Sequence, residues 1–165
     1  MNKMTAEYCA GAIIFRREKA GDLRYFLLRY PNRAKRRVGD EGKLQRRQTS
    51  STVSEEEYWG FVKGHVEAGE SLLETTVREV REETGLKDLK FIDGFKEKES
   101  YFFTKDKEKI CKTVTFLLAE TQTKDIVLSA EHLDSIWLPY QEALTLLTFK
   151  NAKDLLKKAN ELLLR

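Results

Sequence analysis

The feature that most constrains this chain is residues 64–86, where glycine, glutamate and arginine recur at fixed intervals. Ser71 and Glu74 have the spacing of a capping box, which predicts that a helix begins at Ser71. Gly85 predicts its end, because glycine readily adopts the left-handed conformation that closes a helix. We therefore expect a loop, a helix over residues 71–84 and a second loop.

Three acidic residues of this helix, Glu79, Glu82 and Glu83, fall within an arc of about 100° on a helical wheel. The expected buried stripe lies next to that arc. It consists of Leu73, Thr76, Val77, Val80 and Thr84. The carboxylates should therefore stand beside the core rather than on the opposite, solvent-facing side of the helix.

Like charges at this spacing repel one another, by roughly a few tenths of a kcal/mol per exposed pair. Arg78 and Arg81 lie to the sides of the arc and cannot neutralise all three carboxylates. A divalent cation such as Mg²⁺ favours carboxylate oxygens and keeps coordination positions for water and substrate phosphates. The residues alone leave two alternatives open, a cation site or a solvated acidic helix face.

Residues 64–86 match every fixed position of the pattern G-x5-E-x7-R-E-U-x-E-E-x-G-U, in which U is a bulky aliphatic residue. This pattern is the Nudix box, and the chain resembles the Nudix hydrolases. The resemblance implies an α/β (α+β) fold, namely an α/β/α sandwich with a mixed β-sheet and a loop–helix–loop box. It also implies hydrolysis of a nucleoside diphosphate linked to another group, with Mg²⁺ or Mn²⁺ as the cofactor.

The same resemblance implies catalytic and metal-binding roles for Glu79, Glu82 and Glu83, with the main-chain carbonyl of Gly64 as a further ligand. We favour Glu79 as the general base and Glu83 as the most tightly bound ligand, with Glu82 bridging.

A structural role is implied for two other residues of the box, Glu70 and Arg78. They are expected to form an internal ion pair that holds the loop to the helix.

Outside the box, the chain is similar to the diadenosine tetraphosphate hydrolases of the animal and archaeal type, which release ATP and AMP. The similarity is carried by AGAIIFRR, FLLRY, WGFVKGHVEAGE, CKTVTFLLAE and SAEHLDSIWL. It implies that Tyr101 stacks on an adenine and that Glu131 completes a metal site. Contacts to the phosphate chain are implied for Lys63, His65 and Lys112. An ordinary role on a strand or loop is the alternative for four of these residues, namely Tyr101, Glu131, His65 and Lys112.

The rest of the chain alternates between strand-like and helical patterns. Strands are predicted at Tyr8–Arg16, Leu23–Tyr30, Lys90–Thr104, Ile110–Glu120 and Ser135–Pro139, with a short extended piece at Tyr58–Lys63. Helices are predicted at Tyr140–Leu147 and Asn151–Leu164. Strands in both halves with helices between them indicate a mixed sheet covered on both faces.

Residues 31–57 are polar and show no regular period, which predicts a long loop inserted into a single domain of residues 1–165. The loop is basic. Its positive side chains are Arg33, Lys35, Arg36, Arg37, Lys43, Arg46 and Arg47, opposed only by Asp40 and Glu41. It is either a surface that faces a polyanion or a solvated loop.

No apolar run approaches the roughly 18–20 residues that a membrane span requires, so we expect no membrane association. Two cysteines in apolar contexts favour a reducing, cytoplasmic location. The expected partner is a dinucleoside polyphosphate or nucleotide substrate, with nucleic acid less favoured. A monomer or weak dimer is expected.

The function that these observations favour is metal-dependent hydrolysis of a nucleoside polyphosphate, with asymmetric cleavage of diadenosine tetraphosphate as the leading hypothesis. The basic insertion motivates a second hypothesis, a Nudix enzyme that acts on RNA 5′ ends, nucleoside triphosphates or another polyphosphate. A third hypothesis is a non-catalytic nucleotide-binding sensor.

Overall fold

A computed structural model describes residues 4–31 and 57–165 of the chain. The strands are β1 (Thr5–Arg17), β2 (Leu23–Tyr30), β3 (Tyr58–Gly60), β4 (Val62–His65), β5 (Lys90–Lys105), β6 (Glu108–Glu120) and β7 (Asp134–Pro139). The helices are α1 (Leu72–Thr84), α2 (Tyr140–Leu146) and α3 (Lys150–Leu163). The expected basic insertion lies, apart from its end residues, outside the described part of the chain.

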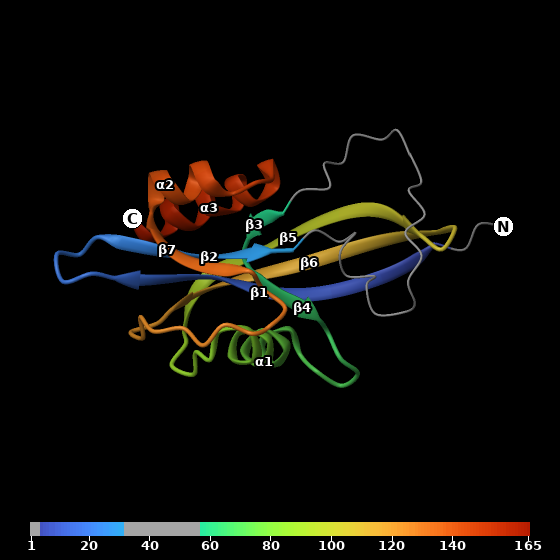
Figure 1. Ribbon diagram of the computed structural model, residues 1–165, viewed down its shortest axis with the longest axis horizontal. Coiled ribbons are helices and arrows are strands. Elements are labelled where there is room, and N and C mark those ends of the chain that lie inside the picture. Colours follow the sequence, from blue (N-terminus) through green and yellow to red (C-terminus); the bar gives the residue numbers. More distant parts are fainter. Residues whose placement is uncertain (1–3, 32–56) are drawn as a thin grey trace.

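The seven strands form one mixed sheet, in which β3-β2-β1-β6-β5 is the main order and β4 and β7 pair with β1 and β2. β1 and β6 run parallel, and the other pairs are antiparallel. Figure 1 shows α1 on one side of the sheet and both α2 and α3 on the other. The predicted α/β/α sandwich is therefore confirmed. Among the described residues, no helix combines the length and apolar character that crossing a bilayer would need.

The region predicted as a short extended piece, Tyr58–Lys63, contributes to two strands with different partners. β3 pairs with β2, whereas β4 pairs with β1 through Cys9, Ala10, Gly11 and Ala12. The switch is possible because β1 pairs with β2 only near its other end, at Phe15–Arg17. As a result Gly64 and His65, expected in the loop before the helix, lie within the sheet.

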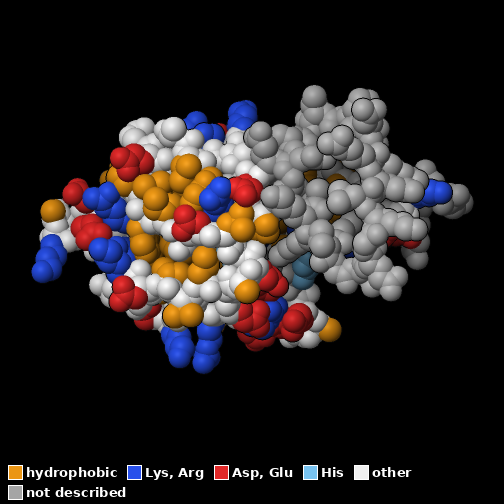
Figure 2. All heavy atoms as spheres, in the orientation of Figure 1, with side chains coloured by type: hydrophobic (Ala, Val, Ile, Leu, Met, Phe, Trp, Pro, Cys, Tyr) orange, Lys and Arg blue, Asp and Glu red, His pale blue; other side chains and the backbone are white. Residues whose placement is uncertain are grey.

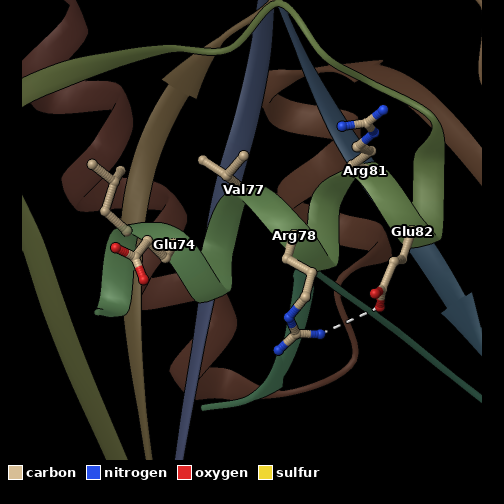
Figure 3. Close-up of a pocket in the computed structure, with 6 residues that line it drawn as sticks. Glu74, Val77, Arg78, Arg81 and Glu82 are labelled. Carbon is tan, nitrogen blue, oxygen red and sulfur yellow. Dashed lines mark hydrogen bonds and ion pairs between the residues drawn. The ribbon is translucent and has the colours of Figure 1, made fainter. Parts of the chain in front are cut away.

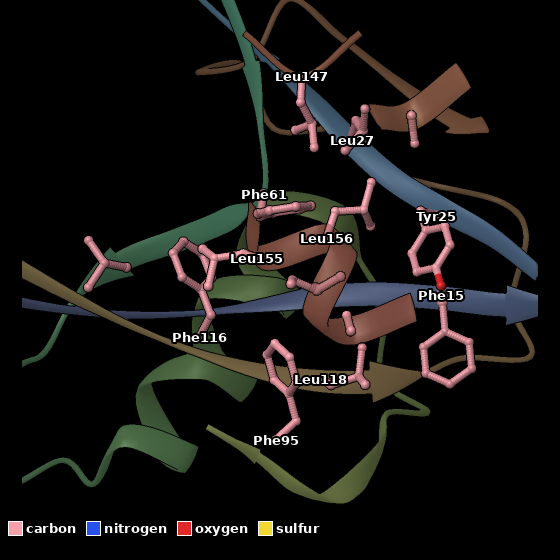
Figure 4. Close-up of a cluster of buried hydrophobic side chains, with 14 of the residues drawn as sticks. Phe15, Tyr25, Leu27, Phe61, Phe95, Phe116, Leu118, Leu147, Leu155 and Leu156 are labelled. Carbon is pink, nitrogen blue, oxygen red and sulfur yellow. The ribbon is translucent and has the colours of Figure 1, made fainter. Parts of the chain in front are cut away.

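The larger hydrophobic core lies between the sheet and the pair α2 and α3. Figure 4 shows aromatic side chains of the strands, including Phe15, Tyr25 and Phe116, packed around Leu155 and Leu156 of α3. A smaller cluster on the other face joins Val80 of α1 to residues of β1, β2 and β4. These two clusters fix the sheet between its helical layers.

Both ends of α1 form as the sequence predicts. The Ser71 hydroxyl accepts a hydrogen bond from the backbone N–H of Glu74 at 3.1 Å, and the Glu74 carboxylate accepts one from the N–H of Ser71 at 3.3 Å. Gly85 has φ 75°, in the left-handed region, and its N–H donates to the carbonyl of Arg81. The capping box and the glycine cap are thus confirmed.

The predicted buried stripe of α1 is partly wrong. Leu73 and Val77 are 48% and 43% exposed, whereas Thr75 and Glu83 are buried together with Thr76, Val80 and Thr84. The helix lies against β1 and β4. Small threonine side chains and glycine or alanine on these strands allow the two layers to approach closely. The helix is therefore turned so that Glu79 and Glu83 lie toward the sheet, whereas Glu82 stays exposed.

Candidate active site

Arg78, in the middle of α1, is the centre of an ion-pair network that reaches back to the loop before the helix. Its guanidinium makes a two-pronged contact with Glu70, through Nε at 2.8 Å and Nη2 at 2.9 Å. Nη2 also donates to the main-chain carbonyl of His65 at 3.0 Å. This guanidinium holds the pKa of Glu70 at about 2, well below its usual range. The pair therefore joins the loop after β4 to the helix.

Arg78 also contacts two of the three box carboxylates. Its Nη1 lies 2.8 Å from Oε1 of Glu79 and 3.3 Å from Oε2 of Glu82. Figure 2 shows acidic and basic side chains side by side at the lower edge of the molecule, where α1 lies in Figure 1. One arginine therefore neutralises part of the acidic arc and leaves Glu83 without an arginine partner in the described part of the chain.

Glu79 lies directly over Gly64 of β4. A Cβ atom at position 64 would overlap the carboxyl carbon and both oxygens of Glu79, so only glycine leaves room for this side chain. The Glu79 side chain is 15% exposed. Burial raises its pKa, with the charges of Glu83 and Glu82 acting in the same direction and the hydrogen bond from Arg78 acting against them.

Glu83 is the most buried of the three carboxylates. Its Oε1 lies 3.1 Å from Nε2 of His132, whose side chain is 1% exposed. Its Oε2 is buried and has no hydrogen-bond partner among the described residues. Glu131 is exposed, yet it brings a carboxylate oxygen into the same small group, in which one ligand atom each from Glu83, Glu131 and His132 lie within 4.8 Å of one another.

Glu82 differs from the other two carboxylates because its side chain is 59% exposed. Figure 3 shows it beside Arg78 on the outer side of α1, where an open depression is lined also by Val77 and Arg81. Neither Glu79 nor Glu83 lines this depression. The box carboxylates are therefore divided between the solvent side of α1 and its contact with the sheet.

The predicted substrate-binding residues gather on the opposite face of the sheet. Tyr101 of β5 is paired with Lys112 of β6, and directly paired residues place their side chains on the same face. The Nζ atom of Lys63 lies 6.0 Å from the centre of the Tyr101 ring. Because Gly64 faces α1, its neighbour Lys63 faces the other way. The carboxylate Glu79 therefore lies on one face of β4, and the predicted substrate-binding residues lie on the other.

His65 lies at the exposed end of β4, and its Nε2 is 3.3 Å from a carboxylate oxygen of Glu7. Glu99 belongs to the same face as Tyr101, two residues away on β5. Burial raises the pKa of Glu99, and the charge of Lys63 opposes that shift. A single carboxylate on a long charged strand has no distinguishing spacing, so no sequence signal marks Glu99.

His132 is the second residue that sequence analysis passed over. It follows Glu131 directly, but nothing in the local sequence shows that it lies against Glu83, forty-nine positions earlier in the chain. A histidine next to a candidate ligand was the available signal. The contact itself is a product of the tertiary structure.

The donor set suits a divalent cation. The structure brings together carboxylate oxygens of Glu83 and Glu131, which hard divalent ions prefer, with a ring nitrogen of His132; Glu79 and Glu82 lie outside this group. The buried Oε2 of Glu83 has no other partner in the described segments, and a buried anionic oxygen without a partner is costly. The residues present therefore fit the ion that the sequence led us to expect.

Comparisons with known proteins define the class. A model of the NUDIX domain matches residues 37–159. The match covers most of the chain, and the chain therefore belongs to the Nudix family, as its box indicates; it is a Nudix hydrolase.

Within that class, the chain is 40% identical over 110 residues to the mouse (Mus musculus) bis(5′-nucleosyl)-tetraphosphatase [asymmetrical], covering 64% of this chain and 72% of the mouse protein. The pig (Sus scrofa) protein of the same name shows the same identity and coverage. A crystal structure of a C. elegans Ap4A hydrolase binary complex superposes with a TM-score of 0.71 at 23% identity. That alignment covers 96% of this chain and 98% of the other.

Proposed function

We propose that this Nudix hydrolase cleaves diadenosine tetraphosphate asymmetrically to ATP and AMP. The observation that carries the proposal is the 40% identity to curated proteins named for that activity. The geometry supports it, because Lys63, Lys112 and Tyr101 share a face of the sheet that adjoins the carboxylates across β4. Such a face suits an extended ligand with a purine at one end and phosphates at the other.

We propose Glu79, Glu82, Glu83, Glu131 and the main-chain carbonyl of Gly64 as the residues that hold Mg²⁺ or Mn²⁺. When bound, the ion neutralises phosphate charge and makes a water molecule more acidic. The buried Oε2 of Glu83, which has no hydrogen-bond partner within residues 4–31 and 57–165, supports its place as the strongest ligand.

The chain's own side chains carry out the proton transfer and hold the site in position. Glu79 takes the proton of the attacking water, a role that suits a carboxylate whose pKa is raised by burial. The water oxygen forms a bond to phosphorus, and the bond from phosphorus to the bridging oxygen breaks. Arg78 bound to Glu70 keeps the loop after β4 against α1, so that Gly64 and Glu79 stay in register.

Substrate contacts follow from the opposite face. Tyr101 stacks on an adenine ring, and the positive charges of Lys63 and Lys112 bind the phosphate chain. His65 adds a hydrogen bond at the exposed end of β4, where it now contacts Glu7. These assignments place the base and phosphate contacts on one face of the sheet and the box carboxylates on the other, with β4 between them.

The test is a product analysis. The protein is incubated with diadenosine tetraphosphate and Mg²⁺, and the nucleotide products are separated by ion-exchange chromatography. We expect equal amounts of ATP and AMP, with none from Glu83→Gln and wild-type rates from Glu161→Gln, which removes an exposed charge on α3. Formation of ADP alone, or binding without turnover, would overturn the proposal.

A second candidate is a Nudix enzyme that acts on another polyphosphate, and the basic residues between positions 33 and 47 favour it. Triphosphorylated RNA and nucleoside triphosphates are therefore run in the same assay. Their hydrolysis in the absence of dinucleotide turnover would replace the first candidate by the second.

We propose that residues 1–165 form one domain, that the protein works in the cytoplasm, and that it is a monomer or weak dimer. The sheet shared by all described strands supports the first of these. Light scattering and limited proteolysis test the first and third together.

A further inference from the structure

His132 is a buried histidine whose ring lies against a carboxylate of the box. Its side chain is 1% exposed, and its Nε2 is 3.1 Å from Oε1 of Glu83, whose side chain is 9% exposed. Neither ring nitrogen has an aligned hydrogen-bond partner in the described residues. Burying a polar ring and an anion without good hydrogen bonds costs free energy, so such a pair calls for an explanation.

The chain holds His132 in place through the segment between β6 and β7. The N–H of Val127 donates to the carbonyl of Thr84 at 2.9 Å, and the N–H of Ser129 donates to the carbonyl of Glu83 at 3.1 Å. These bonds attach the segment to the carboxyl end of α1. The N–H of His132 then donates to the carbonyl of Ser129 at 3.2 Å, which turns the chain back toward the helix.

Aromatic rings fix the histidine from its other side. The Tyr30 ring meets the His132 ring edge-on, with centroids 4.7 Å apart and planes at 88°. Tyr30 is in turn stacked on Tyr58 at 4.7 Å and donates its hydroxyl hydrogen to the carbonyl of Phe61. The imidazole is therefore packed on a rigid support that extends from β2 and β3.

The charges around Glu83 make this contact significant. Arg78 forms ion pairs with Glu67, Glu70, Glu79 and Glu82 but with no atom of Glu83 in the described segments. His132 is thus the nitrogen donor that approaches Glu83. Its contact is with Oε1, which leaves the buried Oε2 available.

We propose that His132 is a positioning residue, whose Nε2–H donates to Oε1 of Glu83 and directs Oε2 toward the divalent ion. The inference rests on the proposed function, because it requires Glu83 to be a metal ligand. A hydrogen bond that is misaligned without the ligand and tightens with it is common in active sites. Removing such an outer partner typically costs about 10–100-fold in metal affinity.

The test measures binding of Mn²⁺ alone, by counting free Mn²⁺ with electron paramagnetic resonance. His132→Leu should raise the Mn²⁺ dissociation constant by about 10–100-fold. His132→Gln, which keeps an N–H near the position of Nε2, should restore most of that affinity. Tyr30→Phe is the control, because it removes a buried hydroxyl contact and keeps the ring against His132; it should lower the melting temperature and leave Mn²⁺ affinity unchanged.

Each result separates the alternatives. Equal Mn²⁺ affinity in His132→Leu and wild type would overturn the positioning role and leave the proposed function intact, whereas no Mn²⁺ binding by the wild type would overturn both. Spin-echo modulation from a directly bound imidazole nitrogen that survives in His65→Gln would also overturn the proposal, because His132 would then be a ligand. If His132→Leu unfolds, a spin-echo spectrum without such nitrogen, together with wild-type affinity in His132→Gln, supports the proposal.

Discussion

Replacing Gly64 by alanine tests the contact between β4 and α1 that places the proposed base. The added Cβ would overlap the Glu79 carboxylate, and real Cβ atoms almost never lie within 3.0 Å of a neighbouring atom. The carboxylate must therefore move by more than about 1 Å. Gly64 is not among the glycines with positive φ, so alanine fits the backbone itself. The substitution therefore displaces the Glu79 side chain and leaves the backbone of β4 as it is.

A displacement of about 1 Å at a catalytic group can cost about 100-fold in rate, which corresponds to about 2.7 kcal/mol in the activation free energy. Stability should change much less, because alanine lowers the entropy of the unfolded chain by an amount that offsets part of the strain. We therefore expect kcat for diadenosine tetraphosphate to fall about 100-fold while the melting temperature moves by only a few degrees.

The matched control is Gly60→Ala on β3. Its Cβ would meet Tyr30 and Tyr58 at 3.6 Å and 3.7 Å, which are ordinary contact distances. Steady-state rates and thermal melting are measured for both variants, and Gly64→Ala is repeated in a Glu79→Ala background. The effect should vanish there, since no carboxylate remains to displace. A Gly64→Ala enzyme with wild-type kcat, or one whose loss persists without Glu79, would refute the reasoning.

Other predictions concern stability and the ion. The pKa of Glu70 is about 2 instead of 4.5, so its pairing with Arg78 stabilises the fold above about pH 4.5, and this contribution disappears as the pH falls toward 2. In urea unfolding from pH 6 down to pH 3, Glu70→Gln should therefore lose less unfolding free energy than the wild type. Gly85→Ala should lower the melting temperature, at a cost of about 1–2 kcal/mol, because its φ is 75°. It should cost more than Gly69→Ala, since only position 85 places the Cβ 3.2 Å from Val127; equal melting temperatures would contradict this. EDTA should abolish hydrolysis and leave the circular dichroism spectrum unchanged, because the two hydrophobic clusters hold the sheet and helices together; a spectrum that collapses with the activity would argue against it.

Local chemistry alone determined much of this protein. The capping box at Ser71 and the glycine at position 85 fixed the ends of α1 because both act through hydrogen bonds between residues close in sequence. Alternating side chains defined the strands for the same reason. The box residues were recognisable because their spacing is itself a sequence property.

The tertiary structure decided which way those elements face. Leu73 and Val77 have the hydrophobicity of a buried stripe, yet they are exposed, because the surface under α1 accepts small threonines and the carboxylates of Glu79 and Glu83. The approach of His132 to Glu83 depends on backbone bonds between α1 and the segment after β6. Such contacts join parts of the chain that are far apart in sequence, so no local period encodes them.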